Sequence, residues 1–255
     1  PRSTGRGVKV AVVDTGIDFQ HPDLAANYKG GYNALDKKKP PLDDHGHGTH
    51  VAGTIAAVKD GRGVVGVAPN ASLYAVKVLD KNGGGRLTSI IKGIVWTGNN
   101  GIQVANMSLG SPVGSLFMRM AVMYAESRGV AIVAAAGNSG GSVGYPAAYG
   151  ETIAVAASDS GDRIARFSSR GKQVNFIAPG VNIKSTLPGG KYGTFSGTSM
   201  ASPHVAGLAV LAVAQGHSGK DGVQAALMAA ARPIEGLEGE EQGRGMINAG
   251  NIRRR

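Results

Sequence analysis

Short runs of β-branched and aliphatic residues alternate along the chain with helix-like segments, and this alternation restricts the fold more than any other feature. Residues 87–96 illustrate the helical kind, because their apolar side chains recur at i, i+3 and i+4. Strands that alternate with helices are joined by right-handed crossovers, which produce a mostly parallel sheet. We therefore expect an α/β fold of three layers, with helices on both faces of a central sheet. The predicted strands are residues 8–13, 71–78, 104–109, 130–133, 152–157 and 174–178. The predicted helices are residues 47–58, 87–96, 116–125, 222–231 and a long helix that opens at residue 199 and continues through residues 205–213.

The size of the chain suits one domain that spans residues 1–255. With 255 residues, 42% of them hydrophobic, the chain can bury a substantial core without a second domain. Its apolar runs are short and interrupted, so we expect no membrane span. No charged-then-apolar segment follows Pro1, so we expect a mature form from which any targeting segment has been removed.

Charge and cysteine content exclude several function classes. The net charge is +10, but the basic residues are scattered, and the two tight runs, residues 37–39 and 253–255, are not interleaved with aromatic residues. A net positive charge without a known nucleic-acid-binding motif is weak evidence for nucleic-acid binding, so we expect no nucleic-acid partner. The absence of cysteine excludes disulfides, thiolate catalysis and cysteine-ligated zinc.

Residues 197–207, with the sequence GTSMASPHVAG, carry the strongest chemical signal. Ser199 stands where a loop enters an apolar helical segment. Free backbone N–H groups and the helix dipole favour developing negative charge at such a helix N-terminus. A serine there is a candidate nucleophile if a histidine and a carboxylate activate it. The alternative is an ordinary helix cap, which is the common use of serine at this position.

A carboxylate and a histidine that could activate Ser199 are present elsewhere in the chain. Asp14 follows a predicted buried strand, and His47 opens a predicted helix. Sites in parallel α/β sheets gather at the carboxyl ends of strands, where Ser108 and Asn138 also fall. Aspartate, histidine and serine are the components of a triad in which the carboxylate orients the base and the base activates the nucleophile.

Six motifs make the whole segment from about residue 8 to residue 248 resemble the subtilisin-like serine peptidases, or subtilases. The order Asp, His, Ser is also that of subtilisin. The resemblance implies a subtilisin-like fold and a serine endopeptidase that works through an acyl-enzyme intermediate. The motifs are DTGIDFQHPD (14–23), HGTHVAG (47–53), GVAP (66–69), NMSLG (106–110), AGN (136–138) and GTSMASPH (197–204).

The resemblance assigns the catalytic roles residue by residue. It makes Ser199 the nucleophile, His47 the general base and Asp14 the residue that orients the histidine. Asn138 matches the side chain that donates to the oxyanion, beside the backbone N–H of Ser199. The alternative for Asn138 is a turn residue, because Asn-Ser-Gly is favourable turn chemistry.

The resemblance also implies a binding cleft for an extended polypeptide. Two segments would flank the substrate as added strands, which makes binding nearly independent of sequence. A pocket with glycine at its floor would accept large aromatic or aliphatic residues before the scissile bond. The implied substrate-binding residues are Gly83, Gly84, Gly85, Ser108, Leu109, Gly110, Ala135 and Gly144.

A structural calcium site is implied by the resemblance of residues 58–64 to the calcium loop of the family. Calcium takes oxygen ligands from carboxylates and carbonyls. Lys59 and Arg62 add positive charge, and the chain has only 13 residues before Asp14, so we expect a short N-terminal segment that lacks the ligand the family usually supplies there. Asn175 stands where a second cation site of some members has a carboxylate, and that site is not expected. The implied ligands are Asp23, Asp60 and the carbonyls of Val58, Arg62 and Val64.

Other functions were weighed against this hypothesis. His47 and His50 at i, i+3 could share zinc, but no HExxH motif is present, and we expect His50 to be a hydrogen-bonded structural residue. Residues 61–66 match GxGxxG but lie after a helix and before a strand, the reverse of a dinucleotide site. An α/β-hydrolase would need GxSxG and the order Ser, Asp, His.

A peptide ligase or macrocyclase of the same fold, and an inactive binding relative, remain as alternatives. A degenerate relative would be expected to lose a residue of the triad or the oxyanion site, and none is lost. The sequence does not separate ligation from hydrolysis. By resemblance we also expect a secreted monomer whose partners are polypeptide substrates and its own propeptide or a protein inhibitor.

Overall fold

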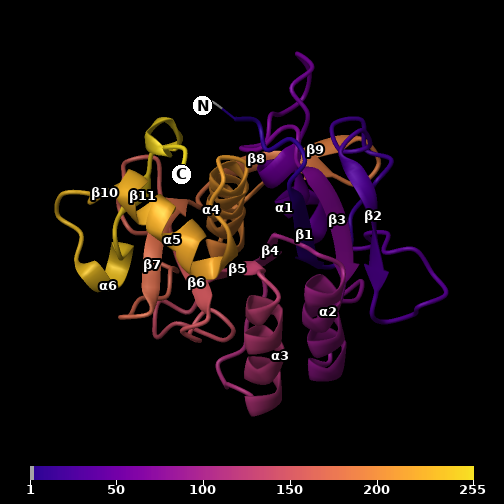
Figure 1. Cartoon of the computed structure of the whole chain (residues 1–255), viewed down its shortest axis with the longest axis horizontal. Coiled ribbons are helices and arrows are strands. Elements are labelled where there is room, and N and C mark those ends of the chain that lie inside the picture. The colour runs from indigo at the N-terminus through magenta and orange to yellow at the C-terminus, as the bar shows by residue number, and fades with distance from the viewer. Residues whose placement is uncertain (1–2) are drawn as a thin grey trace.

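A nine-stranded sheet forms the centre of the molecule in the computed structural model, which describes residues 3–255 (Figure 1). Pro1 and Arg2, which belong to the predicted domain, lie outside the described residues. The strand order is β10-β11-β7-β6-β5-β4-β1-β3-β2, and the strand pairs are parallel except β10 with β11. The strands are β1 (Lys9–Asp14), β2 (Tyr28–Asn33), β3 (Ser72–Lys77), β4 (Val104–Met107), β5 (Ala131–Ala135), β6 (Thr152–Ser158), β7 (Val174–Pro179), β10 (Ala231–Arg232) and β11 (Met246–Ile247).

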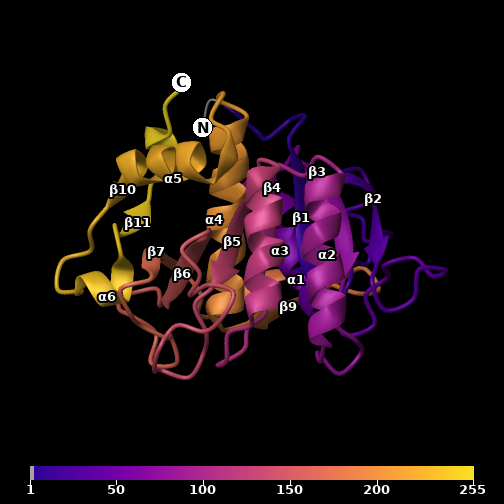
Figure 2. The same ribbon diagram turned by 60° about the horizontal axis from the view of Figure 1, so that its bottom comes forward.

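Helices cover both faces of this sheet and create two separate cores. Along β1 the side chains alternate: Val10 and Val12 join one core, and Ala11 and Val13 join the other. The first core lies against α1 (His47–Ala56), α4 (Thr198–Val213) and α5 (Gly219–Ala230). The second lies against α2 (Leu87–Asn99) and α3 (Leu116–Ser127), which run side by side in Figure 2. The predicted three-layer α/β architecture is confirmed.

The predicted elements differ from the observed ones at their ends, and the differences near the site matter most. The helix predicted over residues 47–58 ends at Ala56, because Ala57 turns to an extended conformation and the N–H of Val58 donates to the carbonyl of Asp23. The helix predicted to open at Ser199 begins at Thr198, so Ser199 lies in its first turn. The strand predicted over residues 104–109 ends at Met107, which leaves residues 108–110 outside the sheet.

Several elements were not predicted. They are β2 at one edge of the sheet, the short strands β10 and β11, and an antiparallel hairpin of β8 (Ile183–Leu187) and β9 (Lys191–Phe195) that forms a second sheet. The others are α6 (Gly239–Gln242) and the 3₁₀ helix η1 (Ala249–Asn251). Within residues 3–255 no helix is both long and apolar enough to cross a membrane.

The register of three adjacent strands brings the predicted site residues to one edge of the sheet. Val12 of β1 pairs with Asn106 of β4, and Met107 of β4 pairs with Ala134 of β5. Asp14 is the last residue of β1. It therefore lies beside residues 108–110, which follow β4, and near residues 136–138, which follow β5. Since all three strands are parallel, their carboxyl ends meet at this edge.

Candidate active site

Asp14 and His47 form the best-defined polar pair of the site. The Nδ1–H group of His47 donates to Oδ1 of Asp14 over 2.8 Å, and the N–H of Thr15 donates to the same oxygen over 2.7 Å. Asp14 is fully buried, and its other oxygen, Oδ2, is buried without a hydrogen-bond partner in the described part of the chain. His47 is the first residue of α1, and its side chain is 21% exposed. The carboxylate thus fixes the tautomer and leaves Nε2 to act as an acceptor.

The electric field at His47 favours its protonated form. Burial lowers the pKa of His47, but the charge and hydrogen bond of Asp14, followed by the charge of Asp43, outweigh burial and raise the pKa above its ordinary value. A histidine with a raised pKa is a stronger base once it is deprotonated. The arrangement suits a group that accepts a proton during a reaction and returns it.

Ser199 lies at the start of α4, as the sequence predicted, and its backbone is held from outside the helix. Pro203 lies inside α4 and has no N–H to offer the carbonyl of Ser199, four residues earlier. The hydroxyl of Ser108 donates to that carbonyl over 2.8 Å. The Ser199 hydroxyl itself donates to the carbonyl of Ser108 over 3.3 Å, and no hydrogen bond joins it to His47 among residues 3–255. Bonds between a nucleophile and its base are often looser without substrate.

Asn138 is oriented by the first residue of the same helix. Its Oδ1 accepts hydrogen bonds from the N–H of Thr198 over 2.8 Å and from the Thr198 hydroxyl over 2.9 Å. Because these donors fix Oδ1, the Nδ2 group is directed away from Thr198. Gly137, which precedes it, has φ 116°, a conformation that favours glycine. Asn138 and Ser199 line the same cavity.

Two cavities meet along residues 108–111. The first, about 630 Å³ in volume, is bordered by His47 and by Gly83, Gly84 and Gly85. The second, about 410 Å³, is bordered by Ser199, Asn138, Ala135 and Gly144, and none of its lining residues is charged. The structure therefore brings together every residue that the sequence predicted for catalysis and substrate binding; their roles remain a proposal. These are Asp14, His47, Asn138, Ser199, Gly83, Gly84, Gly85, Ser108, Leu109, Gly110, Ala135 and Gly144.

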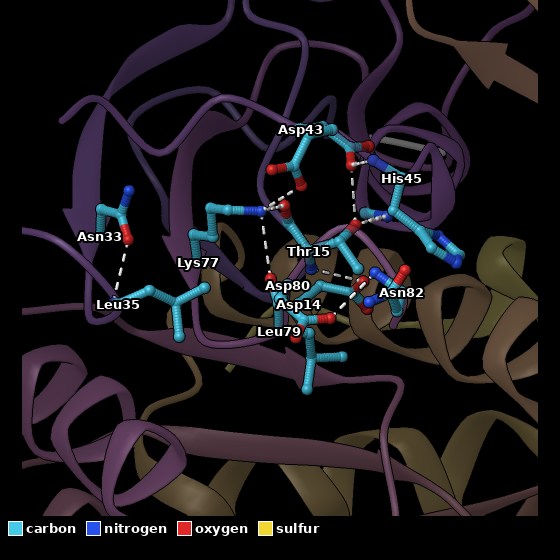
Figure 3. A network of polar contacts seen from close by, with 12 residues as sticks. Asp14, Thr15, Asn33, Leu35, Asp43, His45, Lys77, Leu79, Asp80 and Asn82 are labelled. Carbon is cyan, nitrogen blue, oxygen red and sulfur yellow. Dashed lines mark hydrogen bonds and ion pairs between the residues drawn. The ribbon is translucent and has the colours of Figure 1, made fainter. Parts of the chain in front are cut away.

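Two charged residues behind the site, Lys77 and Asp43, were not predicted from the sequence to support it (Figure 3). Lys77, only 5% exposed at the end of β3, donates from Nζ to the carbonyls of Thr15 and Leu79 and to Asp44. Asp43, 6% exposed, accepts the hydroxyl proton of Thr15 over 2.9 Å. Two features of the sequence could have indicated these residues. Lys77 ends a predicted buried strand, where a charge is unusual, and Asp43 comes just before a predicted helix.

The predicted calcium ligands lie around a buried carboxylate. Asp23 is 1% exposed; its Oδ1 accepts from the hydroxyl of Tyr192 and its Oδ2 from the N–H of Val64. Burial, the hydrogen bond to Asp23 and then the charges of Asp23 and Asp60 raise the pKa of Tyr192. The carbonyls of residues 58, 62 and 64 accept no hydrogen bond within residues 3–255. This set of carboxylate and carbonyl oxygens fits calcium chemistry, whereas Lys59 and Arg62 oppose it.

His50 is tied into the fold rather than exposed to the site. Its Nε2–H group donates to the carbonyls of Ile183 and Gly193 over 3.0 and 3.2 Å, and its ring stacks on Phe195. Its Nδ1 is buried without a partner in the described part of the chain. Burial lowers the pKa of His50 to about 4, so the ring is neutral at neutral pH. It joins α1 to the β8–β9 hairpin.

The strand order and the pairing of Asp14 with His47 define a subtilisin-like α/β protein. The solved structure of a cold-adapted subtilisin-like serine proteinase superposes with a TM-score of 0.87, with 35% sequence identity over 96% of this chain and 88% of that one. A sequence profile of the subtilase family matches residues 5–248. The chain belongs to the subtilase family.

Curated relatives are similar over most of the chain. An alkaline protease of Alkalihalobacillus alcalophilus is 56% identical over 209 residues, which cover 82% of this chain and 54% of the relative. Subtilisin E of Bacillus subtilis (strain 168) is 55% identical and is covered to 56% of its length, and Subtilisin Savinase of Lederbergia lenta is 55% identical and is covered to 77%. The chain thus spans about half the length of several curated relatives that it matches.

Proposed function

We propose that this chain is a serine endopeptidase that hydrolyses extended polypeptides through an acyl-enzyme intermediate. The proposal depends chiefly on one observation: a fully buried carboxylate, Asp14, binds Nδ1 of His47 at 2.8 Å at the sheet edge that also receives Ser199. Membership of the subtilase family supports the same chemistry.

The reaction would proceed in two halves. Oγ of Ser199 attacks the carbonyl carbon of the substrate while Nε2 of His47 takes the hydroxyl proton, and Asp14 stabilises the imidazolium that forms. Collapse of the tetrahedral intermediate breaks the C–N bond, and His47 gives its proton to the departing amine. Water then attacks the acyl-enzyme with His47 again as base, which releases the acid and restores Ser199.

The oxyanion of each tetrahedral intermediate would be bound by two donors. Nδ2 of Asn138 is the first, and the N–H of Ser199 at the start of α4 is the second. Donors fixed before the reaction stabilise developing charge without reorganising. The bonds from Thr198 to Oδ1 of Asn138 keep its amide in this orientation.

Substrate would bind as an added strand between residues 83–85 and residues 108–110. The backbone N–H and C=O groups of Gly85, Leu109 and Gly110 have no hydrogen-bond partner in the described part of the chain. Unpaired edges of this kind accept a peptide through main-chain hydrogen bonds. A side chain at Gly85 would collide with Leu79 and the carbonyl of Val78, so the close approach requires glycine.

The residue before the scissile bond would enter the uncharged cavity of about 410 Å³. Gly144 at its base leaves room for a large side chain, and Ala135 contributes apolar surface. Burying an unpaired charge there would cost several kcal/mol, more than burying a neutral polar group without a partner. We therefore propose a preference for aromatic and large aliphatic residues at this position.

From its family membership we also propose a calcium site, an extracellular location and a monomeric state for the protein. Asp23, Asp60 and the carbonyls of Val58, Arg62 and Val64 would hold a calcium ion, which would stabilise the loop of residues 58–64. The protein would be extracellular, a monomer of one domain, and bound by a propeptide or a protein inhibitor in the substrate cleft.

Hydrolysis of a peptide library by the purified chain tests the proposal. The expected result is cleavage after aromatic and large aliphatic residues. This activity should be lost in Ser199→Ala and kept in Ser127→Ala, which removes an exposed hydroxyl outside both cavities. Mass spectrometry with a competing amine present separates hydrolysis from ligation. Absence of cleavage by the native chain would contradict an endopeptidase, and a strong preference for Arg, Lys or Asp would contradict the pocket.

A further inference from the structure

Asp43 is a second buried carboxylate close to the histidine, and it accepts five hydrogen bonds. Its Oδ1 accepts from the Thr15 hydroxyl and from the N–H groups of His45 and Gly46, over 2.9, 3.0 and 2.9 Å. Its Oδ2 accepts from the N–H and hydroxyl of Thr49, over 2.9 and 2.5 Å. These donors satisfy both oxygens of the buried carboxylate.

These contacts fix the start of helix α1, of which His47 is the first residue. The residue before the helix, Gly46, has no side chain with which to cap it. Asp43 instead binds the N–H of Thr49, and the Thr15 hydroxyl accepts the N–H of Gly48 over 2.9 Å. The orphan N–H groups of the first turn are thus satisfied by residues from outside the helix.

The same contacts reach Asp14. Thr15 donates its hydroxyl proton to Asp43 and its backbone N–H to Oδ1 of Asp14, the oxygen that also binds His47. In Figure 3 Thr15 lies between the two carboxylates. Asp43, Thr15, Asp14 and His47 therefore form a closed ring: one side connects β1 with α1 through Asp43, and the other through the Asp14–His47 bond.

We propose that Asp43 is a positioning residue for catalysis, which locks the first turn of α1 onto the end of β1 and so keeps His47 aligned with Asp14. The proposal depends on the serine peptidase mechanism above. Asp43 touches neither substrate nor nucleophile, and it acts through Thr15 and the helix. A misplacement of about 1 Å at a catalytic group can reduce turnover by about 100-fold.

Asp43 also acts on His47 through its charge. The titratable groups around His47 are Asp14 from β1, Asp43 and His45 from the preceding loop, and His50 from α1. Of these, the two carboxylates raise the pKa of His47, Asp14 more than Asp43. Removing the charge of Asp43 should therefore lower the pKa of His47.

The test compares Asp43→Asn with Asp44→Asn, which removes the same charge from the adjacent, half-exposed carboxylate. For Asp43→Asn we expect kcat to fall by about 10- to 100-fold with little change in KM, and the acidic limb of kcat/KM to move to lower pH. An NMR titration of the His47 ring should show the same direction of shift without reference to activity. Asp44→Asn should leave kcat unchanged.

Variants of Thr15 give a second test of the ring, which can be used even if Asp43→Asn does not fold. Thr15→Val removes the hydroxyl from the ring and should lower kcat, whereas Thr15→Ser keeps it and should restore most of the activity. Active-site titration corrects each rate for the folded fraction. Unchanged kcat and an unmoved His47 pKa in folded Asp43→Asn, or equal kcat in Thr15→Val and Thr15→Ser, would overturn the proposal. An inactive native chain would instead overturn the peptidase assignment.

Discussion

The hydroxyl of Ser108 donates a hydrogen bond of 2.8 Å to the carbonyl oxygen of Ser199. Pro203 leaves this carbonyl without its partner inside α4, and the hydrogen bond from the end of β4 replaces the missing one. Ser108 is itself fixed by Nδ2 of Asn106, whose Oδ1 accepts from Ser202 of the same helix. The candidate nucleophile is thus held in place by the neighbouring strand.

Replacing Ser108 by alanine should destabilise the protein and slow the reaction. The carbonyl of Ser199 would lose its side-chain donor, and an unsatisfied buried polar group costs about 1–3 kcal/mol. The free energy of unfolding should fall by that amount in urea titrations, and kcat should fall as Ser199 shifts. Ser127→Ala, which removes an exposed hydroxyl that donates to the carbonyl of Tyr124, is the control and should change neither quantity. Native kcat in Ser108→Ala would contradict this positioning.

Replacing Asn138 by alanine should lower kcat by about 10²–10³-fold, the usual loss when one oxyanion donor is removed. KM should change little, because the donor acts on the transition state. Asn138→Asp is the informative companion, since its carboxylate still accepts the bonds from Thr198 but donates none. It should be at least as slow as the alanine variant in steady-state assays. Near-native kcat in Asn138→Asp would show that Asn138 only anchors the helix.

His50 should make the protein less stable at acidic pH. Burial lowers its pKa to about 4, whereas the unfolded chain binds the proton near the ordinary value of about 6.5. Between these values the unfolded state holds more protons, so the free energy of unfolding falls as pH falls, by at most about 1.4 kcal/mol per pH unit.

Urea unfolding between pH 4.5 and 7 measures this slope, with Ser199→Ala as background to prevent self-digestion. The variant His50→Gln should have a shallower slope, by about one proton at most. His217→Gln, which makes the same change at a partly buried histidine whose Nε2 contacts the carbonyl of Arg253, is the matched comparison. Equal slopes for His50→Gln and the background would show that His50 does not titrate as proposed.

Calcium should stabilise the native chain. At a concentration 100-fold above its dissociation constant, an ion that binds only the folded state adds about 2.7 kcal/mol. Chelation should therefore lower the Tm by several degrees in calorimetry, and Asp60→Asn should weaken the response to added calcium. Asp36→Asn, an exposed carboxylate far from the loop in sequence, is the charge control. A Tm that is independent of calcium and chelator would contradict the site.

The central sheet and the site residues were predictable because their signals are local. Asp14 closes a β-branched run, Ser199 opens a long apolar helix, and both fall at strand or helix ends where parallel α/β proteins place their chemistry. Strand β2 was not predicted because Gly30 and Gly31 give it little intrinsic preference for extended structure. It becomes a strand by pairing with β3.

The residues behind the site could not be found in this way, because their contacts join distant parts of the chain. Asp43 meets Thr15 across 28 positions, and Lys77 meets Thr15 across 62. The segment around Asp43 contains three histidines and two aspartates, so it resembled a loop or a metal cluster in sequence. Only the fold shows that Asp43 supports the first turn of α1.

Labelling with a serine-directed phosphonate tests the central claim most directly. The native chain should gain one phosphonyl group, located by peptide mass spectrometry on Ser199, and it should lose activity in proportion. His47→Ala should label far more slowly, because the hydroxyl loses its base, and Ser199→Ala should not label. No adduct on the native chain, or an adduct on another serine with Ser199 unmodified, would contradict the assignment of Ser199 as the nucleophile of an Asp14–His47–Ser199 triad.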